Sequence, residues 1–178
     1  MSHTAKILPY YTIADWEQWE GKWELIEGIP YAISPSPVPK HQRISGNLYQ
    51  EFNLQLKNCK HCKVYQAIDW QVTSDTILEP DILVVCGDPG KRLKFPPQLI
   101  VEILSPATTL KDRNTKFYIY EEQKVKYYLI IDPEKNSVEI FVHNNEKYEQ
   151  TSFSNNYHFS FENEREQRLT SQAFGNNS

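Results

Sequence analysis

The stretch that decides the fold is Leu99-Ile100-Val101-Glu102-Ile103-Leu104, a short apolar run with prolines on both sides. An unbroken apolar run of this length is typical of a strand that is covered on both faces. Alternate side chains point to opposite faces, so Glu102 should share its face with Ile100 and Leu104. A carboxylate there is costly to bury unless a cation, a metal ion or several donors meet it. Glu102 is therefore either an edge carboxylate that faces water or pairs with a lysine, or a catalytic or metal-binding residue.

Length, composition and charge narrow the class of protein. The 178 residues, of which 39% are hydrophobic and 13% aromatic, predict a single domain with a substantial core. We expect that domain to span residues 1–160, followed by a polar, weakly ordered C-terminal tail over 161–178. No apolar run approaches the length of a membrane span, and no signal segment is visible at the N-terminus, so a cytoplasmic protein is predicted. The net charge of −4 excludes a global basic field of the kind that promotes nucleic-acid binding.

The order of predicted elements is that of an α/β protein with a mixed sheet. A helical turn is expected within residues 12–19, and a hairpin around a Glu-Gly turn within 23–33. Apolar residues at every fourth position predict a helix over 41–58. A second helix should begin near 105 or 109 and run to about 123. The remaining predicted strands cover 64–72, 81–85, 99–104, 127–132, 138–142 and 148–153.

A second carboxylate, that of Asp81, opens the buried-type strand that precedes the one with Glu102. The connection between these strands, residues 86–98, is short enough for them to lie as neighbours with both carboxylates near one metal ion. Two uncompensated carboxylates about 4 Å apart repel by about 4 kcal/mol at an effective dielectric constant of 20, and a divalent cation removes that repulsion. Carboxylate oxygens suit Mg²⁺ or Mn²⁺ rather than zinc.

Further motifs accompany the two carboxylates in a regular order. They are Glu24 to Gly28, His41 after a proline-rich loop, Pro80-Asp81, Glu102 to Thr108, Asp112 to Lys116, Tyr120 and Asp132-Pro133. Over roughly residues 23–150 this order resembles the PD-(D/E)XK nuclease superfamily, and within it the restriction-endonuclease-type branch known as the Uma-two family. The resemblance implies a restriction-endonuclease-like core, a mixed β-sheet flanked by helices with an N-terminal β-hairpin. It also implies Mg²⁺-dependent hydrolysis of DNA and a homodimer.

One position departs from the superfamily pattern, because Leu104 stands where the E-x-K lysine belongs. The resemblance implies that the following helix supplies the lysine, and Lys116 is the matching residue. Asp112 and Lys116 are four positions apart on one helix face, with the acid first, which is the favourable order. The alternative for this pair is an exposed salt bridge worth a few tenths of a kcal/mol. Given the resemblance, Lys116 is predicted to orient the attacking water or to stabilise the charge of the phosphorane-like transition state.

Several other residues are candidates for accessory roles. His41 would contact the metal or a phosphate, or else satisfy a loop carbonyl. Glu24 or Glu27 would be the additional N-terminal acid that superfamily members often carry, or else an exposed carboxylate; Asp112 is a further candidate. Basic side chains that are candidates for contacts with the nucleic-acid backbone are Lys91, Arg92, Lys94, Lys111 and Arg113.

The three cysteines favour a reducing compartment, because Cys59 and Cys62 are too close for an ordinary disulfide and Cys86 stands alone. Cys59-Lys-His-Cys62 resembles half of a zinc site, but no second pair is present. We therefore expect structural thiols that bind no metal.

Three functions remain open on the sequence. The first is a Mg²⁺- or Mn²⁺-dependent endonuclease in which Asp81 and Glu102 hold the metal and Lys116 positions the water. The second is a non-catalytic nucleic-acid or protein-interaction module that retains the nuclease fold. The third is a metal-dependent hydrolase of a small phosphate ester or nucleotide. The net negative charge and the missing E-x-K lysine favour the non-catalytic module. The presence of Asp81, Glu102 and Lys116 favours an enzyme.

Overall fold

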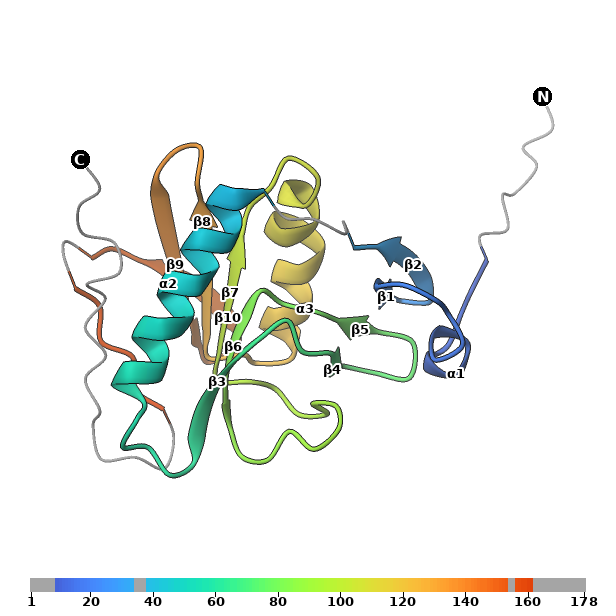
Figure 1. The fold of residues 1–178 in the computed structure, drawn as a ribbon, viewed down its shortest axis with the longest axis horizontal. Coiled ribbons are helices and arrows are strands. Elements are labelled where there is room, and N and C mark those ends of the chain that lie inside the picture. Colours follow the sequence, from blue (N-terminus) through green and yellow to red (C-terminus); the bar gives the residue numbers. More distant parts are fainter. Residues whose placement is uncertain (1–8, 34–37, 154–155, 162–178) are drawn as a thin grey trace.

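A computed structural model describes residues 9–33, 38–153 and 156–161, which form two β-sheets flanked by helices (Figure 1). The predicted α/β class is therefore confirmed. The predicted C-terminal tail lies outside the described residues, except for Phe161, which is buried in the core rather than part of a tail. Within the described ranges, no helix has the length and apolar character that a membrane crossing needs.

The larger sheet is mixed, as predicted, with strand order β10-β9-β8-β7-β6-β3. Only the β7–β8 pair among these neighbours is parallel. The bounds are β3 Cys62–Gln66, β6 Ile82–Cys86, β7 Leu99–Ile103, β8 Tyr127–Asp132, β9 Ser137–Asn144 and β10 Lys147–Thr151. Because β7 lies between β6 and β8, Glu102 is not an edge carboxylate.

Strand β7 is covered on both faces, as its apolar run predicts. Val101 packs with Leu48 of α2 in one core cluster, and Ile100 packs with Tyr120 of α3 in another. Figure 1 shows α2 and α3 on opposite sides of this strand. The alternation of side chains along β7 therefore sends Glu102 toward α3 and away from α2.

The helices occur where they are predicted, with one difference in type. α1 (Ile13–Trp16) follows a capping box between Thr12 and Asp15, and α2 (Pro39–Gln55) covers most of the predicted span. Residues 109–122 are helical, but the central turn, η1 (Lys111–Lys116), is a π-helix that continues into α3 (Phe117–Glu122). π-Helical turns are rare in proteins, and those that occur often lie at functional sites.

The smaller sheet has the order β2-β1-β5-β4 and contains the predicted N-terminal hairpin. Its strands are β1 Trp23–Ile26, β2 Ile29–Ala32, β4 Trp70–Gln71 and β5 Ile77–Leu78. The prediction of one strand over 64–72 is wrong, because the chain leaves the larger sheet at Ala67, whose φ is +48°. A residue in the left-handed conformation ends a regular strand. The alternation of apolar and polar residues continues past Ala67, so the sequence pattern does not reveal where the strand ends.

The predictions that Cys86 stands alone and that Cys62 is a structural thiol are also wrong. Cys62 and Cys86 face each other across β3 and β6 and form a disulfide. This strand pairing joins positions 24 residues apart, which spacing along the chain does not reveal. The cysteines therefore no longer argue for a reducing compartment.

Candidate active site

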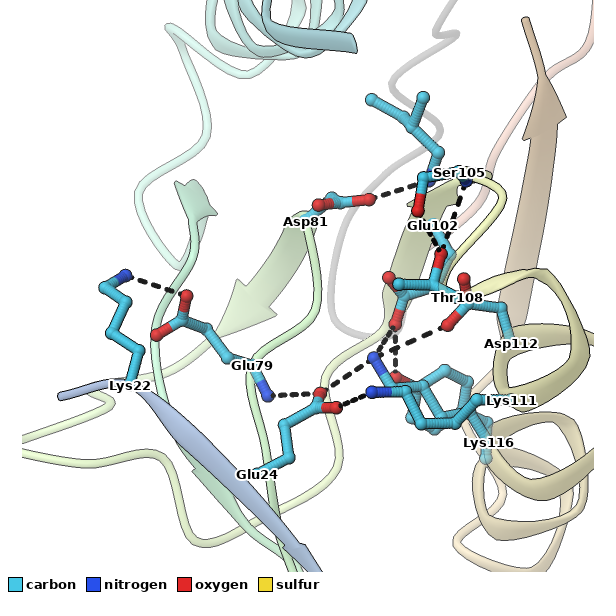
Figure 2. Close-up of polar contacts among 12 residues, drawn as sticks. Lys22, Glu24, Glu79, Asp81, Glu102, Ser105, Thr108, Lys111, Asp112 and Lys116 are labelled. Atoms are coloured by element: carbon cyan, nitrogen blue, oxygen red, sulfur yellow. Dashed lines mark hydrogen bonds and ion pairs between the residues drawn. The ribbon is translucent and has the colours of Figure 1, made fainter. Parts of the chain in front are cut away.

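A buried ammonium group lies at the centre of the site (Figure 2). The Nζ atom of Lys116 lies 2.8 Å from Glu24 Oε1 and 2.9 Å from Glu102 Oε1. A third carboxylate oxygen, Asp112 Oδ1, lies 3.6 Å from the same nitrogen. All four side chains are at most 4% exposed. Burial of a charge at this depth requires partners of opposite sign, and the cluster supplies them from three elements.

The π-helical turn explains why two lysines reach one carboxylate of the hairpin. Lys116 contacts Glu24 Oε1, while Lys111 forms an ion pair with Glu24 Oε2. In an α-helix, residues five apart point about 140° away from each other around the axis. A π-helix instead bonds residue i to residue i+5, which brings such residues to the same side. Glu24 also accepts a hydrogen bond from the backbone N–H of Glu79, at 3.1 Å.

Glu102 is held from a second direction by an aromatic residue of α3. The hydroxyl of Tyr120 donates to Glu102 Oε1 at 2.7 Å, and the ring stacks on Trp70 with a centroid distance of 5.9 Å. The hydroxyl of Tyr128 donates to the carbonyl of Asp112 at 2.9 Å. The Tyr120 contact orients the Glu102 carboxyl group, and the Tyr128 contact holds the backbone at Asp112.

Asp81 lies beside this cluster and makes its contacts on another side. The pairing of Ile82 with Val101 places Asp81 opposite Glu102 in register. Its Oδ2 atom accepts the N–H of Ile103 at 2.7 Å and lies 3.2 Å from His41 Nε2. The Asp81 side chain is 25% exposed, whereas Glu102 is buried. The structure thus brings Glu24, Glu102, Asp112 and Lys116 into contact, and pairs Asp81 with His41 next to them.

Burial and charge shift the pKa values of these groups. Burial raises the pKa of Glu102 to about 8, although the Lys116 ammonium opposes the shift. Burial raises the pKa of Asp112 in the same way. Burial opposes the charge of Lys116, but its carboxylate neighbours, Glu102 first, raise its pKa well above the ordinary value. Burial likewise opposes the charge of Glu24, yet the two lysines lower its pKa. The hydrogen bond to Asp81 raises the pKa of His41.

The remaining predicted residues lie outside the cluster. Glu27 is exposed in the hairpin turn. Arg92 bonds to Glu17 and lies over Trp16, and Arg113 forms a two-pronged ion pair with Glu139, so both are engaged within the chain. Lys91 and Lys94 are exposed in the loop before β7.

Sequence reasoning did not anticipate the contact between Lys111 and Glu24. It also gave no role to Tyr120, although the motif order included that tyrosine. The helical pattern carried no signal for either contact, since one depends on a π-turn and the other on packing against β7.

The oxygen atoms of these carboxyl groups suit a hard divalent cation that takes only one or two ligands from the protein. Within residues 9–33, 38–153 and 156–161, no three Asp, Glu, His or Cys side chains are placed to hold a metal ion together. Mg²⁺ commonly keeps several waters and binds through one or two carboxylates, which Glu102 and Asp81 offer. Asp112 Oδ1 finds no hydrogen-bond partner among the described residues. A buried acceptor oxygen that no donor meets is one that a cation can contact.

Comparison with known proteins agrees with this reading of the motifs. A family described as "Putative restriction endonuclease", Uma2, matches residues 10–174. The chain belongs to the Uma2 family. The match spans every residue of the site, from Glu24 to Tyr120.

The fold of this chain is also present in a solved structure. A crystal structure of "a putative nuclease belonging to DUF820" from Anabaena variabilis ATCC 29413 superimposes with a TM-score of 0.71. It is 17% identical and the alignment covers 92% of this chain and 97% of that one. At this identity the likeness shows the shared fold. No curated protein matches the chain.

Proposed function

We propose that this Uma2 protein is an endonuclease that hydrolyses phosphodiester bonds in DNA with Mg²⁺ or Mn²⁺. The observation that carries the proposal is the buried Glu102 in the central strand, held between Lys116 and Tyr120 and opposite Asp81 in register. Acids in such positions are strained and expensive, and they cluster at functional sites. The family match and the fold match support a nuclease.

In this proposal Glu102 and Asp81 hold the divalent cation. When bound, the cation lowers the pKa of a coordinated water and stabilises the charge that develops on the phosphoryl group. The imidazole Nε2 of His41 and the backbone N–H of Ile103 both contact Asp81 Oδ2 and hold the carboxylate in one orientation. Lys116 orients Glu102 and keeps a positive charge beside it, which lowers the repulsion that an anionic substrate meets.

The test is cleavage of plasmid and end-labelled DNA with Mg²⁺ or Mn²⁺, with EDTA as the negative control. Asp81→Asn and Glu102→Gln should each lower the cleavage rate by at least about 100-fold, since they remove ligand charge. Glu149→Gln, a change of an exposed acid on β10, is the matched control and should cut like wild type. Equal rates in all four proteins would refute the assignment of the site.

One observation favours a second function, a binding module without catalysis. In the described structure the ammonium of Lys116 already neutralises part of the acidic cluster, so the fold does not require a metal for charge balance. This candidate predicts a protein that binds DNA and leaves it uncut under all metal conditions. The homodimer and the cytoplasmic location stay predictions; size-exclusion chromatography with light scattering tests the first.

A further inference from the structure

We infer that Lys111, rather than Lys116, is the lysine that contacts the phosphate of the substrate. This inference rests on the proposed nuclease function and divides the work of the site between its two lysines. The helix pattern favours Lys116, because Lys116 shares a helix face with Asp112. The contacts of the folded chain favour Lys111.

Lys116 is committed to the acids of the protein itself. Its ammonium group lies 2.8 Å from Glu24 Oε1, 2.9 Å from Glu102 Oε1 and 3.6 Å from Asp112 Oδ1. Its side chain is 4% exposed. If Lys116 turned toward a substrate, buried carboxylates would lose their main counter-charge, which is strongly unfavourable. Lys116 is therefore a positioning residue that acts through Glu102.

Lys111 can exchange its partner at much lower cost. Among the described residues its ion-pair partner is Glu24, which would still keep Lys116 and the N–H of Glu79 if Lys111 moved away. The Lys111 side chain is 17% exposed and that of Lys116 is 4% exposed, so Lys111 is the more accessible of the two lysines that contact Glu24. A phosphate oxygen can therefore replace the Glu24 contact without leaving a bare charge behind.

The surroundings of Lys111 keep its ammonium in this position. The Lys111 Nζ atom lies 5.5 Å from the centre of the Tyr31 ring on β2, within the range of a cation–π contact. Tyr31 itself is 38% exposed. The π-turn sets the direction of the side chain, because it turns Lys111 to the side of the helix that carries Lys116. An anion that approaches three acidic side chains needs a cation that it can reach, and Lys111 is the more exposed of the two lysines there.

The experiment measures the salt dependence of DNA binding by fluorescence anisotropy, with a short labelled duplex in EDTA so that no hydrolysis occurs. For Lys111→Met we expect a Kd about tenfold higher at low salt, and a slope of log K against log salt smaller by about 1, as the loss of one phosphate contact predicts. Lys111→Arg should keep the slope. Lys116→Met, if folded, should keep it too. Lys147→Met on the edge strand β10 is the matched control. Lys111→Gln, which can still bond to Glu24, replaces Lys111→Met if the latter melts early.

The possible results separate this inference from the function on which it rests. A smaller slope in Lys111→Met and an unchanged slope in Lys116→Met support it. Wild-type cleavage and binding with an unchanged slope in Lys111→Met overturn the inference and leave the nuclease standing. A smaller slope in Lys116→Met alone overturns it as well. A wild-type protein that neither binds nor cuts DNA overturns both.

Discussion

Replacing Lys116 by Met tests whether the buried ammonium holds the site together. Met fills a similar volume, so the main effect is the loss of charge next to three carboxylates that are each at most 4% exposed. Removing one partner of a buried ion pair costs about 3–5 kcal/mol. A protein of this size loses about 2–4 °C in Tm per kcal/mol, so the melting temperature should fall by about 6–20 °C.

The effect of Lys116→Met should also depend on pH in a defined direction. Without Lys116, the pKa values of Glu102 and Asp112 in the folded state rise further above their unfolded values. The pKa of Glu24 also rises, because one of the two ammonium groups that lower it is gone. The folded state then binds protons that the unfolded state has released, so stability falls as pH rises through this window. We expect a larger loss at pH 8 than at pH 5, measured by urea unfolding in EDTA without reductant. Lys147→Met is the control, and a Lys116→Met protein that melts within 2 °C of wild type at pH 8 would contradict the reasoning.

Three further changes have defined outcomes. Burial raises the pKa of Glu102 to about 8 in the folded state, above its unfolded value, so this residue's contribution to stability is present at low pH and is lost toward pH 8. Glu102→Gln in EDTA should remove a decline of up to about 1.4 kcal/mol per pH unit between pH 5 and 8, and parallel wild-type and variant profiles would show that Glu102 does not titrate there. Cys86→Ser opens a disulfide that spans 24 positions and should lower stability by about 2–4 kcal/mol, a difference that must vanish when wild type is reduced. Arg113→Lys loses the two-pronged geometry with the half-buried Glu139 and should lower stability by about 1 kcal/mol or less, with urea midpoints as the measurement.

Local patterns in the sequence were enough for most elements of the fold. The apolar run at Leu99–Leu104 predicts a covered strand, and the structure confirms it between β6 and β8. Strand alternation and helical spacing are short-range consequences of backbone geometry, so they survive in any tertiary context that buries the same faces. The same logic places Asp112 and Lys116 on one helix face, and the 3.6 Å contact agrees with it.

The sequence alone determined that a buried acid, Glu102, needs a partner, and the family resemblance placed Lys116 at the same site. Only the tertiary structure decided the rest of the cluster. Glu24 reaches Lys116 across 92 positions of sequence, because the hairpin packs against the helix that follows β7. Lys111 joins them through a π-turn, and Cys62 meets Cys86 through strand pairing. The physical reason is one of range: periodicity records how a segment lies on its neighbours, whereas ion pairs and disulfides depend on which distant segments meet.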